Sequence, residues 1–162
     1  MMNRTHAPAG AVLLALVVTF AYGQQGCSTG PKSDKGNNEM STEVRGVLEA
    51  QAAAWNRGDL EGFMDGYERS DDTVFVSGDE VTRGWQTVLD RYKKNYDSRE
   101  KMGTLAFTDL EIKPLSPFYA VALGRWQLAR AGDTPHGRFT LVFRRTAKGW
   151  KIVHDHTSSA SK

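Results

Sequence analysis

Four long strand-like segments fill the C-terminal third of this chain, and they constrain its fold more than any other feature. They cover residues 104–113, 118–130, 136–145 and 150–157, with Pro, Gly and Ser in the short breaks between them. Breaks of this composition turn the chain back on itself, so consecutive strands pair antiparallel. The sequence therefore predicts a meander of strands whose apolar face needs a cover from elsewhere in the chain.

Helical segments precede the meander and can supply that cover. Apolar residues recur every three or four positions over residues 42–56, which is the spacing of an amphipathic helix. Gly58 ends that helix, Asp59 caps a short second one, and a third is expected over residues 84–96. One short strand, residues 73–76, precedes the third helix. This order predicts an α+β fold: a cone-shaped, curved antiparallel sheet with three N-terminal helices packed across one face.

The N-terminus has the layout of an export signal. Residues 1–23 combine a basic start, an apolar run and small residues, and the run is too short for a comfortable membrane-spanning helix. Two processing sites compete: cleavage after Gly23, or lipidation of Cys27 at a sequence that resembles an imperfect bacterial lipobox. We therefore expect an exported bacterial protein that is periplasmic or secreted, or that is anchored to the membrane by a lipid on Cys27.

The rest of the chain is expected to form one domain with polar ends. Residues 24–40 predict a disordered tether, residues 41–158 the folded domain, and residues 159–162 a short tail. The formal net charge of +2 is too small to indicate nucleic-acid binding. The single cysteine excludes an internal disulfide, and the sequence has no Gly-rich phosphate loop, so we expect no cofactor.

Several motifs resemble one known group of proteins. Residues 55–63, Trp-Asn-Arg-Gly-Asp-Leu-Glu-Gly-Phe, are similar to the helix–turn–helix entry of SnoaL-like and ketosteroid-isomerase-like domains of the nuclear transport factor two-like superfamily. Gly84 fits the head of their third helix, and residues 149–158 also resemble the end of the association domain of calcium/calmodulin-dependent kinase. The resemblance spans residues 41–158 and implies the cone fold. This superfamily contains isomerases, dehydratases, hydrolases, ligand binders and assembly modules, so the activity stays open.

The kinase resemblance also implies which residues look into the cone. The residue that matches Arg125 is a pocket arginine there, and so is the residue that matches Thr157. Because side chains alternate along a strand, Asp155 shares the face of Thr157. We expect Arg125 to bind a ligand, or to pair with Asp155 when the cavity is empty. Threonine in place of the second arginine removes one pocket cation and weakens the expectation of an anion-selective pocket.

The opposite face of the last strand is expected to lie outside the cone. Trp150, Ile152, His154 and His156 share that face by alternation, and the register implied by the resemblance adds Trp126. Because these domains usually dimerise through the outer sheet face, His154, His156 and Trp126 are the predicted dimer residues. Two histidines fall short of the four ligands of a structural zinc, so no metal site is expected.

Asp155 is the predicted general base and Tyr67 the predicted proton donor. An aspartate in an apolar cone has a raised pKa and can abstract a proton next to a carbonyl, whereas pairing with Arg125 would lower that pKa. Aromatic walls predict a ligand that is apolar or aromatic with few polar groups. The aromatic residues assigned to the ligand site are Trp55, Trp85 and Tyr96.

The sequence leaves three functions open. The leading hypothesis is an exported homodimer that binds a small apolar or carboxylate-bearing molecule, held by Arg125, in the cone. The first alternative is a cofactor-free isomerase, dehydratase or cyclase that uses Asp155 with Tyr67. The second is a non-catalytic assembly module, in which the sheet surface forms the dimer and the cavity has no role.

Overall fold

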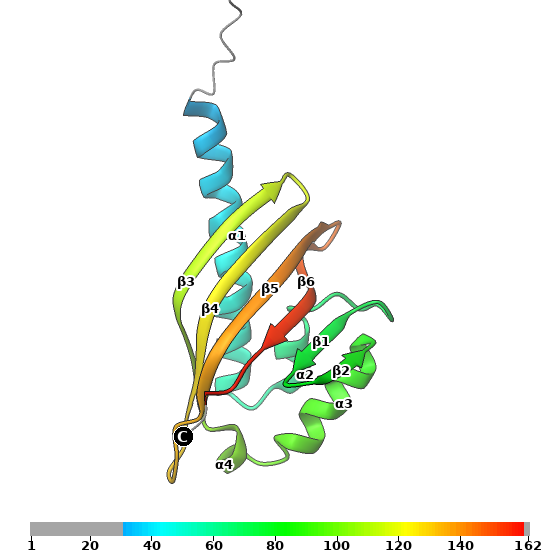
Figure 1. The fold of residues 1–162 in the computed structure, drawn as a ribbon, viewed down its shortest axis with the longest axis vertical. Helices are drawn as coiled ribbons and strands as arrows, with labels where there is room; N and C mark the ends of the chain where they lie inside the picture. Colours follow the sequence, from blue (N-terminus) through cyan, green and yellow to red (C-terminus); the bar gives the residue numbers. More distant parts are fainter. Residues whose placement is uncertain (1–30, 161–162) are drawn as a thin grey trace, which may run out of the picture.

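The computed structural model describes residues 31–160 and confirms the predicted α+β architecture. Helices cover one face of a curved, open sheet, along which the long first helix runs (Figure 1). The helices are α1 (Pro31–Asn56), α2 (Leu60–Met64), α3 (Trp85–Asn95) and α4 (Arg99–Met102). The strands are β1 (Val74–Ser77), β2 (Glu80–Arg83), β3 (Thr104–Ser116), β4 (Tyr119–Ala129), β5 (His136–Thr146) and β6 (Gly149–Thr157).

The strand order in the sheet is β2-β1-β6-β5-β4-β3. Strands β3 to β6 form the predicted meander, and each neighbouring pair in it is antiparallel. β1 pairs with β6 in parallel, so the sheet is mixed and not purely antiparallel as predicted. A parallel pair needs a long connection, and here the chain between β1 and β6 passes through α3, α4 and the meander. The prediction lacks β2 and α4, because four residues carry too little periodicity to be recognised.

The first helix begins at Pro31, inside the segment for which the sequence predicts a disordered tether. Proline suits a first helical turn because it needs no amide hydrogen there, and the Thr42 hydroxyl donates to the carbonyl oxygen of Asn38 at 2.9 Å. Most side chains of residues 34–41 are exposed, so these turns extend the packed part of the helix by local propagation and not by packing. The predicted export signal, Cys27 and the start of the tether lie outside the described residues. No helix in residues 31–160 is long and apolar enough to cross a bilayer.

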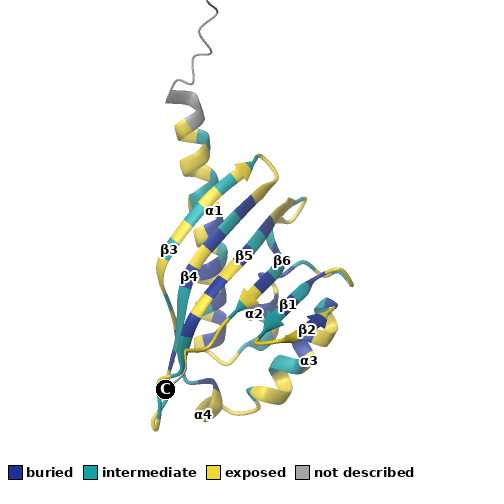
Figure 2. Cartoon of the chain, viewed as in Figure 1, coloured by how far each residue is buried: buried dark blue, intermediate teal, exposed yellow. Residues whose placement is uncertain are grey.

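The core lies between α1 and the helix-covered face of the sheet (Figure 2). α1 presents a buried stripe at the predicted helical spacing, which includes Val44, Leu48 and Trp55. The strands bury every second residue, so buried and exposed positions alternate along β4 and β5. Phe143 and Ile152 are fully buried on this face of the sheet. The contact between stripe and sheet therefore fixes which strand positions face the helices.

A β-bulge in β6 changes that alternation and corrects one prediction. The pairing of β6 with β5 shifts register at Val153, which has no partner in β5. One extra residue reverses the direction of every side chain beyond it. Trp150 and Ile152 therefore face the helices before the bulge, and Asp155 and Thr157 do so after it. The prediction that Trp150 and Ile152 lie on the outer face is wrong, because both are buried against the helices.

Candidate functional site

A cavity of about 200 Å³ opens between the helices and the sheet. Every strand except β2 contributes to its wall, as do α1, α2 and α3 and the segments that follow α2, α3 and β6. The inner wall is mainly aromatic and aliphatic, with the buried polar residues Gln51 and Asp155. The most deeply placed aromatic residues are Trp55, Phe63, Tyr67, Phe75 and Phe139. The rim is more exposed and polar, and it contains Ser77, Arg91, Asn95, Thr157 and Ser159.

The aromatic wall is held by edge-to-face contacts. The ring centre of Trp55 lies 4.7 Å from that of Tyr96 and 5.2 Å from that of Phe63. Phe63 makes a similar contact with Tyr92 at 5.2 Å. The indole N–H of Trp55 donates to the carbonyl oxygen of Met102 at 3.2 Å, so it is not free to bind a ligand. These contacts make a rigid surface that suits an apolar or aromatic guest.

Asp155 and Tyr67 form the polar centre of the cavity. The Tyr67 hydroxyl donates to Oδ2 of Asp155 at 2.7 Å, and the two residues are 2% and 5% exposed. Oδ1 of Asp155 is buried and has no hydrogen-bond partner among the described residues. Two backbone hydrogen bonds at 2.9 Å, from Glu68 to Ile152 and from Ile152 to Gly66, hold the segment after α2 against β6. Backbone pairing of these two distant segments thus brings Tyr67 next to Asp155.

Burial sets the protonation of both groups. Removal from water raises the pKa of Asp155 to about 7, although the hydrogen bond from Tyr67 opposes that rise. Burial, and next the charge of Asp155, raises the pKa of Tyr67 well above its ordinary value. At neutral pH Tyr67 therefore stays protonated, while Asp155 is populated in both its protonated and its charged form. Such a carboxyl group can accept or donate a proton or a hydrogen bond.

Arg91 is the rim cation that sequence reasoning missed. It extends from α3, and its side chain is 21% exposed. Its Nη1 donates to the Thr82 hydroxyl at 3.1 Å and pairs with Glu80, while the guanidinium lies 5.2 Å from the ring centre of Phe75. Arg91 follows Val88 of the apolar stripe by three positions, so the two share a face of the third helix, and this spacing was the available signal.

Arg125 lies on the outer face of the sheet, so the predicted Arg125–Asp155 pair does not form. β4 buries Ala122, Gly124 and Leu128. Because side chains alternate along a strand, Arg125 points to the opposite face from these three residues. A side chain at Gly124 would overlap Phe139, which explains why β4 turns its small residues inward. The register inferred from the kinase resemblance was therefore displaced by one residue in β4.

The displacement in β4 brings Trp126 to the inner face, and a second tryptophan assignment, that of Trp85 in α3, is wrong for a separate reason. Trp126, predicted for the dimer face, lines the cavity, and its indole N–H donates to the carbonyl oxygen of Ser158 at 3.0 Å. Trp85, predicted for the ligand site, is not part of the cavity lining. Its indole N–H donates to the Met64 carbonyl oxygen at 2.9 Å, and the guanidinium of Arg69 lies 4.3 Å from its ring centre. Trp85 thus supports the packing of α2 against α3.

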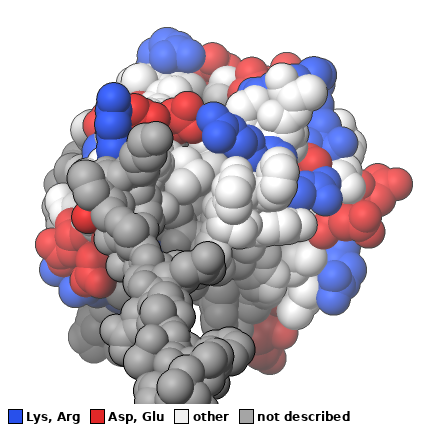
Figure 3. Space-filling model, turned by 90° about the horizontal axis from the view of Figure 1, so that it is seen from above, with Lys and Arg blue, Asp and Glu red and all other residues white. Residues whose placement is uncertain are grey.

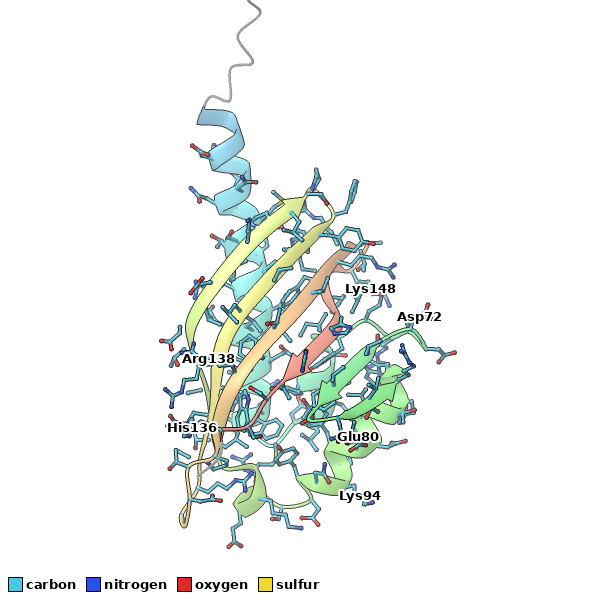
Figure 4. All side chains as sticks on the ribbon, in the orientation of Figure 1. Asp72, Glu80, Lys94, His136, Arg138 and Lys148 are labelled. Carbon is cyan, nitrogen blue, oxygen red and sulfur yellow. The ribbon has the colours of Figure 1, made fainter. Side chains whose placement is uncertain are left out.

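The remaining predicted residues take the expected faces. Tyr96 and Thr157 line the cavity with Trp55, while His154 and His156 lie on the outer face. Figure 4 labels His136 and Arg138 at the far end of β5 from the β5–β6 turn. Within residues 31–160 no three His, Cys, Asp or Glu side chains are placed to hold a metal ion.

Charged side chains of both signs are interspersed on the face of the molecule seen from above (Figure 3). Elsewhere in the described chain, charged side chains form pairs: Arg145 lies 2.9 Å from Glu43, and Arg144 contacts Glu68. Lys148 lies in the turn between β5 and β6 (Figure 4). Among the described residues of this face, no broad area of positive charge is present that would suit nucleic acid.

Comparison with known proteins identifies a family and similar solved structures for this chain. The SnoaL-like domain family matches residues 44–162. An NTF-2 like protein of unknown function from Shewanella oneidensis MR-1 is 42% identical, over 72% of this chain and 97% of that one, and its structure superposes with a TM-score of 0.70. No curated protein matches the chain significantly.

More distant structures share the fold alone. A ketosteroid isomerase-like protein from Erwinia carotovora atroseptica SCRI1043 is 19% identical over 77% of this chain and 99% of that one, with a TM-score of 0.63. A putative calcium/calmodulin dependent protein kinase II association domain from Xanthomonas campestris is 17% identical over 74% of this chain and 87% of that one, with a TM-score of 0.60. Both agree with the resemblance seen in the sequence.

Proposed function

Because this chain belongs to the SnoaL-like domain family, we propose that its cavity binds a small, largely apolar molecule with one polar group that hydrogen-bonds to Asp155. The observation that supports this function is the unpartnered Oδ1 of Asp155 in an otherwise apolar wall. A buried polar atom without a partner costs about 1–3 kcal/mol. A ligand that supplies the missing hydrogen bond recovers that energy, which favours binding at this point.

The size and lining of the cavity define the ligand class. At about 200 Å³ the cavity is smaller than the clefts of roughly 300–1,000 Å³ that hold drug-sized molecules. Aromatic rings on several sides suit a flat guest that stacks or makes edge contacts. The polar group donates a hydrogen bond to Asp155 when its carboxyl is charged, and accepts one when it is protonated.

Calorimetric titration with phenol and with toluene tests this proposal. The two probes share a ring, and only phenol carries a hydroxyl group for Asp155. We expect phenol to bind at least tenfold more tightly to the native protein, since a hydrogen bond to a charged group is worth about 1.5–3 kcal/mol. Asp155→Leu should abolish the preference, whereas Asp109→Asn, on an exposed residue outside the cavity lining, should keep it. Equal binding of the two probes to the native protein contradicts the proposal.

Proton transfer is the second candidate function, and the pKa of Asp155 favours it. A carboxyl group that titrates near pH 7 is suited to act as a general base at neutral pH. Exchange of the α-protons of phenylacetone in heavy water, followed by NMR, measures this activity directly. We expect exchange to rise as the pH increases through about 7 and to disappear in Asp155→Asn. Exchange at the rate of the buffer alone would leave the site a binding site only.

We also propose that the protein is a homodimer that associates through the outer sheet face. No helix covers this face in residues 31–160 (Figure 1), and apolar side chains such as Leu123, which is 39% exposed, lie on it among polar ones. Sedimentation at micromolar concentration tests this: Leu123→Glu should give monomers. Trp126→Glu is unsuitable, because Trp126 lines the cavity. A native protein that sediments as a monomer contradicts the proposal.

Export remains a proposal from the sequence. Residues 1–23 are proposed to direct secretion, with Cys27 as the site of a lipid anchor if the lipobox is used. Cell fractionation of the native chain and of Cys27→Ser distinguishes the two processing routes. Release of only the variant from membranes supports lipidation, and a soluble native protein supports cleavage after Gly23.

A further inference from the structure

We infer that Arg91 forms a second polar end of the cavity and that the ligand carries an anionic group, such as a carboxylate, at that end. This inference rests on the proposed function, because it concerns the same cavity. It assigns the ligand two polar groups: an oxygen that meets Asp155 in the interior and an acid that meets Arg91 at the rim. Among the described residues, Arg91 is the one lysine or arginine that lines the cavity.

The contacts of Arg91 leave part of its guanidinium available. Its polar side-chain contacts in residues 31–160, with Thr82 and with Glu80, are made by Nη1. Nε and Nη2 therefore retain donors that can bind both oxygens of a carboxylate, the geometry for which a guanidinium is suited. The ring of Phe75 lies against the guanidinium at 5.2 Å and limits its movement.

Glu80 is an exposed partner of Arg91, so their ion pair is weaker than one with a buried carboxylate would be. The Glu80 side chain is 65% exposed, and Glu80 is the first residue of β2, next to the turn that follows β1 (Figure 4). An exposed ion pair contributes little to stability, since water competes for both groups. A ligand carboxylate enclosed by the cavity is less exposed to water and so interacts more strongly with the same guanidinium.

Phe75 connects the two polar ends. It is paired directly with Asp155 across β1 and β6, and both side chains line the cavity. Arg91 lies over the ring of the same residue, so Phe75 is next to both polar groups of the cavity. A ligand that meets both groups must therefore be short and must place its apolar part against Phe75. Small aryl acids with a hydroxyl group at the opposite end of the ring fulfil these conditions.

Three such acids of increasing length test the inference: para-hydroxybenzoate, para-hydroxyphenylacetate and para-hydroxyphenylpropionate. Each is compared with its neutral primary amide by calorimetric titration of the full chain. We expect at least one acid to bind about tenfold more tightly than its amide, as a charge-assisted pair predicts. Arg91→Gln should remove this preference. Arg83→Gln, on an exposed residue of β2 outside the cavity, should keep it.

Glu80→Gln provides a second variant that leaves Arg91 in place. It removes the competing carboxylate, so the preference for acid over amide should increase several-fold. An unchanged preference in Glu80→Gln overturns the inference even if Arg91→Gln fails to fold. Equal binding of acids and amides to the native protein also overturns it, while phenol binding that depends on Asp155 would still support the proposed function. If phenol too fails to bind, the proposed function falls and the inference falls with it.

Discussion

The two faces of the sheet carry similar residue types but put them to different chemical use. Asp155 on the inner face is buried, hydrogen-bonded by Tyr67, and has a pKa raised to about 7. Asp109 in β3 is exposed and pairs with Arg138 at 3.2 Å. The same carboxyl group is thus a buried group that titrates near neutral pH in one place and a solvated surface charge in the other. Burial, and not residue type, separates the two.

The largest difference between the faces is expected in packing energy. Phe143 on the inner face is fully buried, and Phe143→Ala should lower the free energy of unfolding by about 3–5 kcal/mol through lost contacts and a cavity. Leu123 on the outer face is 39% exposed, and Leu123→Ala should cost about 1 kcal/mol or less. Urea unfolding of both variants measures the two values. Similar losses would mean that the outer face is also buried, as in a tight dimer.

The second effect is the pH dependence that Asp155 contributes to stability. Its pKa is raised on folding from 3.8 to about 7, so between these values the folded state holds a proton that the unfolded state has lost. Stability should therefore fall as pH rises from about 4 to 7, by at most about 4 kcal/mol at 1.36 kcal/mol per pH unit. In Asp155→Asn this fall of the free energy of unfolding with pH should be absent, whereas Asp109→Asn should show the same pH dependence as the native protein. Unfolding at a series of pH values gives both curves, and identical curves for native protein and Asp155→Asn would show that burial does not shift this group.

Tyr67→Phe should have a smaller effect on the same pair. The variant leaves both oxygens of Asp155 without a protein partner among the described residues. We expect it to lower the free energy of unfolding by about 1–3 kcal/mol at pH 8 and to raise the pKa of Asp155 further. Carbon NMR of labelled aspartate measures the pKa. Tyr119→Phe, on an exposed residue, should change neither quantity, and an unchanged pKa in Tyr67→Phe would mean that the hydroxyl is not bonded to Asp155 in solution.

The smallest effects are expected on the outer face. Asp109→Asn removes an exposed ion pair and should cost less than about 1 kcal/mol, with the difference vanishing at high salt. Asparagine also tolerates the positive φ of 52° at this position, so the backbone should not be strained. Thermal unfolding at low and high salt provides the measurement. A loss of several kcal/mol would show that Asp109 is buried by a partner surface.

Much of the fold could be read from the chain because its signals are local. The helical stripe of α1, the Asp59 cap of α2 and the turns of the meander each depend on residues close in sequence. The Asp59 carboxylate accepts from the Gly62 amide at 2.7 Å, as the capping pattern predicts. The parallel β1–β6 pair was missed, because it joins strands separated by most of the domain.

The candidate site was predicted only in part for the same reason. Asp155, Tyr67, Trp55, Tyr96 and Thr157 were assigned to the cavity and line it. Arg125 and Trp126 were assigned to the wrong faces, because a shift of one residue in β4 moves every side chain to the other face. Trp85, at the start of α3, packs against α2 and does not line the cavity, and Arg91 in the same helix was not assigned to the site.

The sequence by itself determined the order of the three main helices, the first strand, the meander and the family, because periodicity, caps and turns act over a few residues. Only the tertiary structure decided which polar groups meet. The bulge at Val153 lets Ile152 and Asp155 face the same side, and the backbone pairing of the segment after α2 brings Tyr67 to that carboxyl. Register and burial arise from contacts between distant segments, so no local pattern could specify them.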